Sequence, residues 1–199
     1  MELENKLGLS GRELDEAEER ISKRRAKELY AGGLKEIETG TWAGLAEIHR
    51  RLFEEIYPFA GKMRTMNISK GMFRFASALY LDEALKKISA MPQGTFDEII
   101  RKYVEMNIAH PFMEGNGRAT RIWLDDMLMG GLGKMVDWQK IPREDYLMAM
   151  ERSPVKDTEI RSLIENALTE ETGNQELYMH SIDASYRYEG YSRYRTETL

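Results

Sequence analysis

The chain of 199 residues contains no cysteine, so disulfide bonds and thiolate metal sites are excluded. It lacks the run of about 18 apolar residues that a membrane-spanning helix needs, and its acidic first residues do not resemble the apolar core of a signal peptide. Basic residues are in deficit: a net charge of −5 and a pI of about 5.4 disfavour broad binding to nucleic acid or to an anionic membrane. We therefore expect a cytoplasmic protein with no nucleic-acid or membrane partner.

Hydrophobic periodicity predicts helices over most of the chain, and neither an internal repeat nor a low-complexity linker divides it. Only residues 64–75 show the looser alternation of a short hairpin, which is expected to turn near Lys70 and Gly71. The sequence therefore predicts an all-α fold in one domain with one small β-hairpin. The predicted helices cover residues 12–31, 42–56, 79–90, 95–109, 118–129, 143–152, 157–168 and 174–189.

Several details of this pattern carry expectations of their own. The charged helix over 12–31 is predicted to lie on the surface, and the glycine-rich residues 130–133 are predicted to break the chain. His49 lies among apolar neighbours and is interpreted as a structural residue. The adjacent acids Asp125 and Asp126 fall late in a predicted helix, where they oppose its dipole, and have no functional interpretation.

Residues 110–121, with the sequence HPFMEGNGRATR, carry most of the chemistry. The helix before this run should end at His110, because Pro111 has no amide hydrogen and disfavours a helical conformation in the residue before it. Histidine titrates near neutral pH, so an imidazole held in such a loop is a candidate general base. Phe112 is expected to anchor the loop in the core.

The second half of the run has the features of an anion site. Gly115 and Gly117 let the backbone take positive φ, so that successive amide hydrogens converge on an anion, and the helix behind them adds its positive dipole end. Arg118 and Arg121 are three residues apart and lie on one helical side, with planar guanidinium groups that suit phosphate oxygens. Glu114 is a hard oxygen ligand of the kind that holds magnesium shared with phosphates.

The run resembles the signature of the Fic family, which is histidine, any residue, phenylalanine, any residue, acid, glycine, asparagine, glycine, arginine and a second arginine three residues later. Every defined position is filled, and the resemblance extends from about residue 40 to the C-terminus. It implies a single Fic domain over residues 1–199. Within it, residues 1–39 are expected to form an N-terminal helical extension, 40–170 the Fic core and 174–190 a C-terminal inhibitory helix.

The resemblance implies a protein adenylyltransferase, which transfers AMP from ATP to a tyrosine, serine or threonine hydroxyl of a target protein or of the enzyme itself. His110 would take the proton of the attacking hydroxyl. Glu114 would hold the metal ion, with Mg²⁺ expected and Mn²⁺ or Ca²⁺ as alternatives.

The phosphates of ATP are assigned to the rest of the signature. Asn116 and the amides of Gly115 and Gly117 would hold the α- and β-phosphate oxygens. Arg118 and Arg121 would neutralise the leaving pyrophosphate.

The predicted hairpin corresponds to the segment that the family calls the flap, which aligns an extended piece of the target by strand addition. Its side chains are expected to say little about the partner, because backbone contacts supply the affinity. The residues assigned to this docking role are Ile68, Ser69, Lys70, Gly71, Met72 and Phe73.

The predicted last helix carries a carboxylate, Glu189, at its negative end, which costs up to about 1 kcal/mol unless a cation answers it. From Ser185 to Gly190 the chain resembles the family's inhibitory motif, although Tyr191 stands where asparagine is usual. The resemblance implies that Glu189 takes the guanidinium of Arg121 and so misaligns ATP.

Several alternatives remain open at this point. One of the two tyrosines Tyr186 and Tyr188 is predicted to become modified when the inhibitory helix is released, and Glu189 could orient a water that removes AMP from a modified target. The oligomeric state is open; a homo-oligomer that restrains the helix would favour the inhibited form at high concentration by mass action. The competing class of function is a non-catalytic nucleotide-binding interaction module that its own tail keeps closed.

Overall fold

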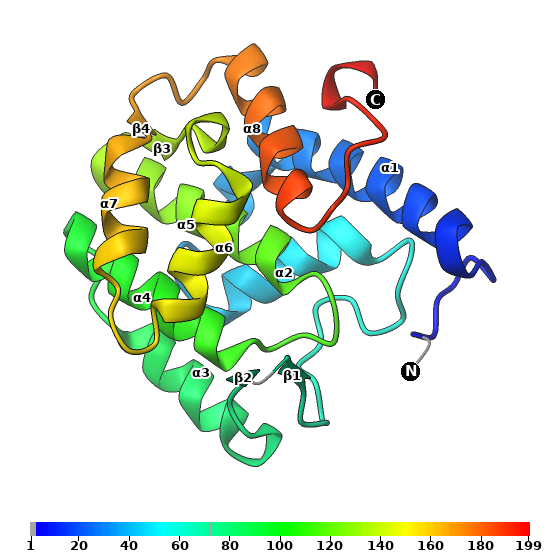
Figure 1. Cartoon of the computed structure of the whole chain (residues 1–199), viewed down its shortest axis with the longest axis horizontal. Helices are drawn as coiled ribbons and strands as arrows, with labels where there is room; N and C mark the ends of the chain where they lie inside the picture. The colour runs from blue at the N-terminus through cyan, green and yellow to red at the C-terminus, as the bar shows by residue number, and fades with distance from the viewer. Residues whose placement is uncertain (1–2, 72) are drawn as a thin grey trace.

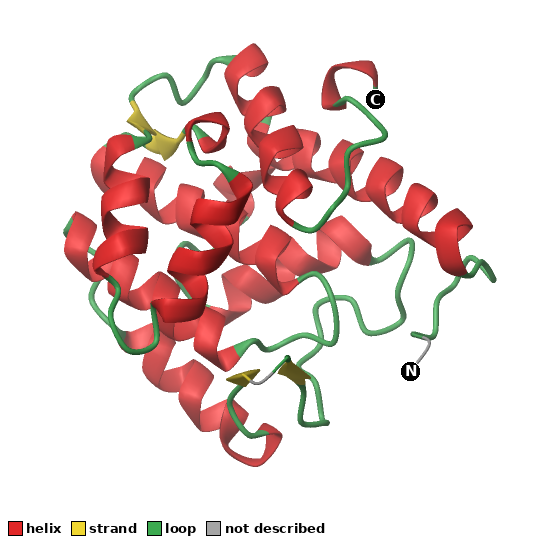
Figure 2. Cartoon of the chain, in the orientation of Figure 1, coloured by secondary structure: helices red, strands yellow, loops and turns green. Residues whose placement is uncertain are grey.

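A computed structural model describes residues 3–71 and 73–199. Helices dominate it, and two short antiparallel strand pairs lie at opposite sides of the molecule (Figures 1 and 2). The helices are α1 (Gly11–Tyr30), α2 (Trp42–Phe53), α3 (Leu81–Ala90), α4 (Phe96–Ala109), α5 (Asn116–Leu132), α6 (Arg143–Arg152), α7 (Thr158–Asn166) and α8 (Gln175–Tyr188). The strands are β1 (Ser69–Lys70), β2 (Phe73–Arg74), β3 (Met135–Val136) and β4 (Leu168–Thr169).

The centre of the fold is α5, which packs against α2 and α4. It is buried on all sides from Arg118 to Leu128, so no polar face faces solvent. Its side chains also support neighbours: the indole of Trp123 donates to the carbonyl of Thr41 at 3.1 Å. A helix surrounded in this way holds its N-terminus rigidly, and the candidate site lies there.

The predicted break after α5 is wrong in position. The helix continues through Gly130 and Gly131 and ends at Gly133, whose φ of 63° is the left-handed conformation that glycine favours at a helix end. Gly131 faces the carbonyl of Gln93 and the side chain of Ile99. Packing of the last turn on its neighbours outweighs the low helix propensity of the glycines.

Two other boundaries differ from the prediction. The helix predicted over 157–168 ends at Asn166, because Leu168–Thr169 instead pairs with Met135–Val136 in a second strand pair that the sequence pattern did not indicate. The helix predicted from residue 79 begins at Leu81, after a 3₁₀ turn over Ala78–Tyr80. Short strands of two residues carry too little periodicity to be recognised in advance.

The predicted hairpin is confirmed. Ser69 pairs with Arg74 and Lys70 with Phe73, and the turn begins at Gly71 with a φ of 59°. Met72, which was also assigned to the flap, lies outside the described residues. The hairpin is the dark green segment beside α3 in Figure 1.

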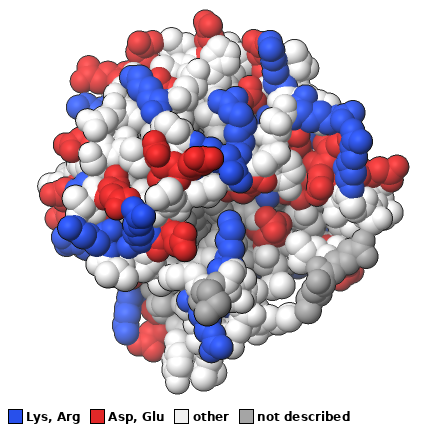
Figure 3. All heavy atoms as spheres, in the orientation of Figure 1, with Lys and Arg blue, Asp and Glu red and all other residues white. Residues whose placement is uncertain are grey.

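The expectation that α1 is a surface helix is wrong for one of its faces. Glu18, Glu19, Ser22 and Lys23 are buried, because α8 and the C-terminal residues pack across this face. Elsewhere the surface mixes both signs of charge: basic and acidic side chains are interspersed over the face in Figure 3. Across residues 3–71 and 73–199, no helix combines the length and apolarity needed to cross a membrane.

The pair Asp125 and Asp126 lies in the middle of α5, because the helix is longer than predicted. Asp125 is fully buried and accepts hydrogen bonds from the Tyr30 hydroxyl at 2.5 Å, the Val136 amide at 2.8 Å and the Trp138 indole at 3.0 Å. Its carboxylate therefore joins α1, α5 and the segment after α5, which is a structural role.

Candidate active site

The imidazole of His110 lies at the C-terminal end of α4. The residue has φ 49° and ψ 65°, so it turns the chain out of the helix as expected from the following proline. Its ring stacks on Phe75, with centroids 3.7 Å apart. Burial lowers the pKa of His110 to about 3, so the ring is neutral near pH 7.

Hydrogen bonds within the loop after His110 determine its conformation. The Asn116 amide brackets Phe112, accepting from its N–H and donating to its carbonyl, both at 2.8 Å. One lone pair of the Asn116 oxygen and one of its two Nδ2 hydrogens are thus used inside the loop, and the contact of Asn116 with a phosphate stays a prediction. Phe112 is fully buried and stacks on His49 at 3.7 Å, as its predicted anchoring role requires.

The structural interpretation of His49 agrees with its contacts. Its Nδ1 accepts from the Gly61 amide at 2.9 Å, so Nε2 carries the hydrogen and donates to the Glu114 carbonyl at 2.8 Å. Burial lowers the pKa of His49 to about 3, which keeps the ring neutral and this tautomer in place. His49 thus orients the backbone just before the glycines.

The glycines of the signature are required by space. Gly115 has a φ of 77°, and a Cβ there would lie 2.5 Å from the Phe53 ring. Because α5 begins at Asn116, its first-turn amides point toward one spot. A Cβ on Gly117 would lie 2.3 Å from Oε1 of Glu189, so a carboxylate lies directly against this first turn.

Glu114 presents a carboxylate at the edge of the site. Its side chain is 42% exposed, accepts from the Gly115 amide at 2.9 Å and pairs with Arg118 at 3.2 Å. Among the described residues, no group of three or more histidine or acidic side chains could hold a metal alone. A single accessible carboxylate fits Mg²⁺, which keeps several waters and shares its remaining positions with phosphates.

Arg118 is placed differently from the prediction. Its side chain is 1% exposed, and its guanidinium pairs at 2.5 Å with Glu18 of α1, which the sequence analysis did not single out. In the sequence, the burial of Glu18 is indicated only by its position four residues after Leu14, on the apolar side of α1. Aromatic rings enclose this guanidinium: Phe53, Tyr186 and Tyr191.

Arg121 makes the predicted contact with the last helix. Its Nη2 donates to both oxygens of Glu189, at 2.7 and 2.6 Å, and to the Ser185 carbonyl at 2.9 Å. Its Nε donates to the Ser185 hydroxyl at 2.7 Å, and its Nη1 to the Tyr146 hydroxyl at 3.2 Å. The guanidinium of Arg121 therefore offsets the unfavourable interaction between the Glu189 carboxylate and the negative end of α8.

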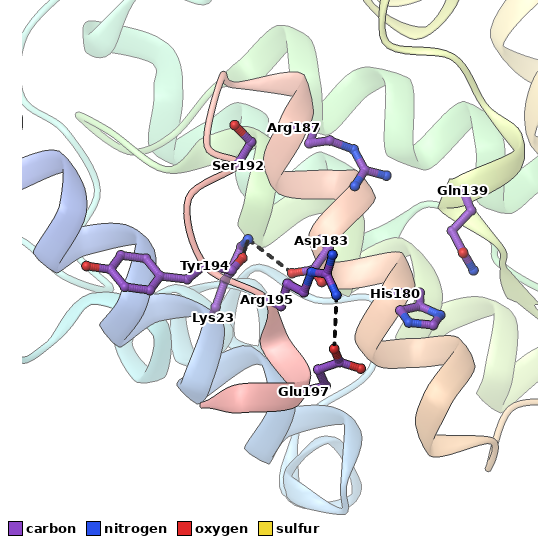
Figure 4. A pocket seen from close by; sticks show the side chains of 9 residues that line it. All are labelled: Lys23, Gln139, His180, Asp183, Arg187, Ser192, Tyr194, Arg195 and Glu197. Atoms are coloured by element: carbon purple, nitrogen blue, oxygen red, sulfur yellow. Dashed lines mark hydrogen bonds and ion pairs between the residues drawn. The ribbon is translucent and has the colours of Figure 1, made fainter.

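A polar network connects α8 with α1 and with the C-terminal segment (Figure 4). Buried Lys23 of α1 pairs with Asp183 of α8 at 3.0 Å and donates to the Tyr194 carbonyl at 2.6 Å. Asp183 in turn accepts from the Thr196 hydroxyl at 2.7 Å. A cavity of about 390 Å³ lies between α8 and this C-terminal segment, so polar contacts around a hollow, rather than dense packing, hold the segment here.

Tyr186 and Tyr188 are buried in the described arrangement, at 1% and 3% exposure. The Tyr188 hydroxyl donates to the carbonyls of Trp138 and Ile141. Neither hydroxyl is accessible for modification while α8 is docked, so the predicted modification requires α8 to leave its place.

Comparison with known proteins places these features in one family. The model of the Fic/DOC family matches residues 41–128. "Probable protein adenylyltransferase y4lH" of Sinorhizobium fredii is 30% identical over 153 residues, which are 71% of this chain and 77% of that protein. "Protein adenylyltransferase VbhT" of Bartonella schoenbuchensis is 30% identical over 147 residues; the match covers 67% of this chain but only 30% of VbhT.

Solved structures agree on the fold. The BepC protein of Bartonella tribocorum, crystallised with bound AMPPNP, superposes with a TM-score of 0.71 at 19% identity, over 84% of this chain and 92% of that one. The type IV secretion system effector protein BepA superposes with a TM-score of 0.72 at 20% identity, over 98% of this chain and 73% of that one.

Proposed function

We propose that this chain, which belongs to the Fic/DOC family, transfers AMP from ATP to a side-chain hydroxyl of a protein and is restrained by its own helix α8. The names of the relatives support adenylyl transfer, and the AMPPNP bound to BepC supports a nucleotide substrate. The observation that carries the proposal is that His110 ends α4 in the loop that leads to the N-terminus of α5, where the Glu189 carboxylate takes the position suited to a phosphate.

In the transfer step, a target hydroxyl attacks the α-phosphorus of ATP. Its proton passes to the neutral His110 ring as the new oxygen–phosphorus bond forms and the bond to pyrophosphate breaks. The negative charge of the leaving group develops near the first-turn amides of α5, which are oriented before the reaction begins.

The phosphate-binding roles are divided among several groups. Gly115 and Gly117 leave room for the phosphates to approach the backbone, and Asn116, whose side chain also shapes the loop, would join their amides in holding the α- and β-phosphate oxygens. Arg121 would contact the γ-phosphate. Glu114 would hold Mg²⁺, which supplies charge neutralisation at the phosphates. Arg118, buried against Glu18, would act on the phosphates through its positive electrostatic potential.

Restraint follows from competition for Arg121. While Glu189 holds this guanidinium, the γ-phosphate has no free partner there, and ATP would bind with its α-phosphorus out of line. Misalignment of this kind costs about a hundredfold in rate. Removal of AMP through a water held by Glu189 stays a prediction.

The partner roles are proposals of the same kind. The hairpin is exposed at Ser69 and Lys70, and within the described ranges β1 pairs with β2 alone, which suits strand addition by an extended segment of the target. Tyr186 or Tyr188 is proposed as a self-modification site after α8 is released. A homo-oligomer would stabilise the docked form by mass action.

Intact mass measured after incubation with ATP and Mg²⁺ tests the proposal. The native chain, Glu189→Gly and Glu189→Gly with His110→Ala are compared. We expect only Glu189→Gly to gain the mass of AMP. If no form gains mass, alone or with a bacterial lysate as the source of targets, transfer is contradicted. The closed nucleotide-binding module then becomes the better account, and the burial of Tyr186 and Tyr188 under the docked helix would agree with it.

A further inference from the structure

Arg64 is a buried cation that meets only neutral carbonyl oxygens in the described part of the chain. Its Nε donates to His110 at 2.7 Å, and its Nη2 donates to Ala109 at 3.1 Å and Ala76 at 2.6 Å. Its Nη1 donates to Met66 at 2.6 Å. The side chain is fully enclosed, and desolvation lowers the pKa of Arg64. A buried charge without a carboxylate is expensive, so this arrangement needs a compensating field.

The C-terminal end of α4 supplies that field. Ala109 is the last residue of the helix and His110 its cap, so their carbonyls belong to the negative end of the helix dipole. The planar guanidinium reaches both of these carbonyls and two others at once, which a lysine ammonium at a single point would not do.

The backbone at His110 needs outside support. It is the one non-glycine residue with positive φ among the described residues, and it precedes a proline, where an extended conformation is preferred. Such a conformation is strained and persists only where the surroundings enforce it. Arg64 holds the carbonyls of Ala109 and His110 through its side chain and that of Pro111 through its own amide, at 2.8 Å.

The same guanidinium holds both ends of the segment that carries the hairpin. Met66 precedes β1 and Ala76 follows β2, and the Ala76 amide donates to the Ile108 carbonyl at 3.1 Å. Between these points Phe75 stacks on the His110 ring. One side chain therefore connects the candidate base with both ends of the candidate docking segment.

We propose that Arg64 is a positioning residue, which holds the His110 loop and the hairpin segment 66–76 in one fixed relation. The inference rests on the proposed function for its catalytic consequence. A target strand aligned on the hairpin would then present its hydroxyl at a set distance from the imidazole, and loss of Arg64 would impair the transfer step rather than the binding of ATP.

The first test measures self-adenylylation in the Glu189→Gly background, at saturating ATP and as a function of ATP concentration. Arg64→Met should lower the maximal rate constant about a hundredfold, with the half-saturating ATP concentration changed less than about twofold. Arg64→Lys, which keeps the charge and three donors, should recover part of the rate. The proposal is overturned if Arg64→Met retains the rate, or if the rate falls only through weaker ATP binding.

Lys102→Met provides a matched control. Lys102 is also a buried cation that donates to backbone carbonyls, those of Ser89 and Met91, but it lies on α4 away from His110. Its loss should lower the melting temperature while leaving the rate within about threefold. If Lys102→Met and Arg64→Met lower stability and rate together to the same extent, Arg64 has only a structural role.

A second readout does not depend on activity. The chain has three histidines, so the His110 imidazole resonances are assignable by NMR in the native chain and its variants. Arg64→Met should shift these resonances strongly, while Lys102→Met should leave them in place. If Glu189→Gly proves inactive, the proposed function fails, but this shift still tests the positioning of His110; unchanged His110 resonances in Arg64→Met would refute it.

Discussion

The two arginines of the signature are both buried, yet their acidic partners differ. Arg118 pairs with Glu18, whose side chain is 2% exposed. Arg121 pairs with Glu189, whose side chain is 26% exposed and which caps the end of α8 just before Gly190. The partners come from opposite ends of the chain and reach the same turn of α5.

The surroundings explain what each pair can do. The Tyr57 and Tyr191 hydroxyls both donate to Glu18, so removing that carboxylate would strand a cation and leave two donors without their acceptor. Glu189 meets solvent as well as Arg121, and an incoming phosphate oxygen can replace it at little desolvation cost. We therefore expect the first pair to be a permanent part of the fold and the second to be an exchangeable contact.

The largest effect is expected from the permanent pair. Glu18→Ala leaves the buried Arg118 with only the more exposed Glu114 as a counter-charge, which should lower the free energy of unfolding by about 3–5 kcal/mol. Urea denaturation measures this loss. Glu13→Ala, an exposed acid in the first turn of the same helix, is the control and should change stability little. A Glu18 variant that is fully stable and newly active would show that both pairs are exchangeable.

The exchangeable pair should act on rate. Glu189→Gly frees Arg121 and should raise the rate of AMP incorporation about a hundredfold, equivalent to about 2.7 kcal/mol. Glu197→Gly removes an acid of the same charge that pairs with exposed Arg195, and should leave the rate unchanged. Equal activation by both substitutions would mean that net charge, and not the Arg121 contact, controls the enzyme.

Ser185→Ala should have a smaller effect in the same direction. The change removes the hydroxyl that accepts from Nε of Arg121 but keeps the Glu189 contact. A hydrogen bond to a charged group contributes about 1.5–3 kcal/mol, of which the remaining contacts recover part, so activation of about fivefold is expected. Rates measured beside Glu189→Gly check this order; activation as large as that of Glu189→Gly would contradict it.

The pH profile should show almost no change near neutrality. The neutral imidazole is the active form, and burial lowers the pKa of His110 to about 3, so acidification from pH 8 to 6 does not protonate it. The rate of Glu189→Gly should therefore stay level over this range. A fall with a midpoint near 6.5, the ordinary value for histidine, would show that His110 is solvated in the active form.

Local patterns in the sequence predicted much of the site. The end of α4 at residue 110, the glycine nest and the Arg121–Glu189 contact all depend on residues close in sequence or on a motif of fixed spacing. The helices and the first hairpin were predictable for the same reason, since their periodicity is local.

What the sequence did not reveal depends on contacts between distant segments. Glu18 meets Arg118 across 100 positions, and Arg64 meets His110 across 46, with no periodicity that marks either pair. The two-residue strands β3 and β4 likewise exist only because α5 and α7 bring them together. The two hydrogen bonds between the Asn116 side chain and Phe112 were not predicted for a related reason, because they are visible only in three dimensions.

Calorimetric titration with ATP and with ADP tests the central claim most directly, that Glu189 occupies the place of the γ-phosphate on Arg121. In the native chain the two nucleotides should bind with similar Kd, because Arg121 is already paired. In Glu189→Gly, ATP should bind about tenfold more tightly than ADP, a difference of about 1.4 kcal/mol. The same ratio of Kd values in both proteins would contradict the account.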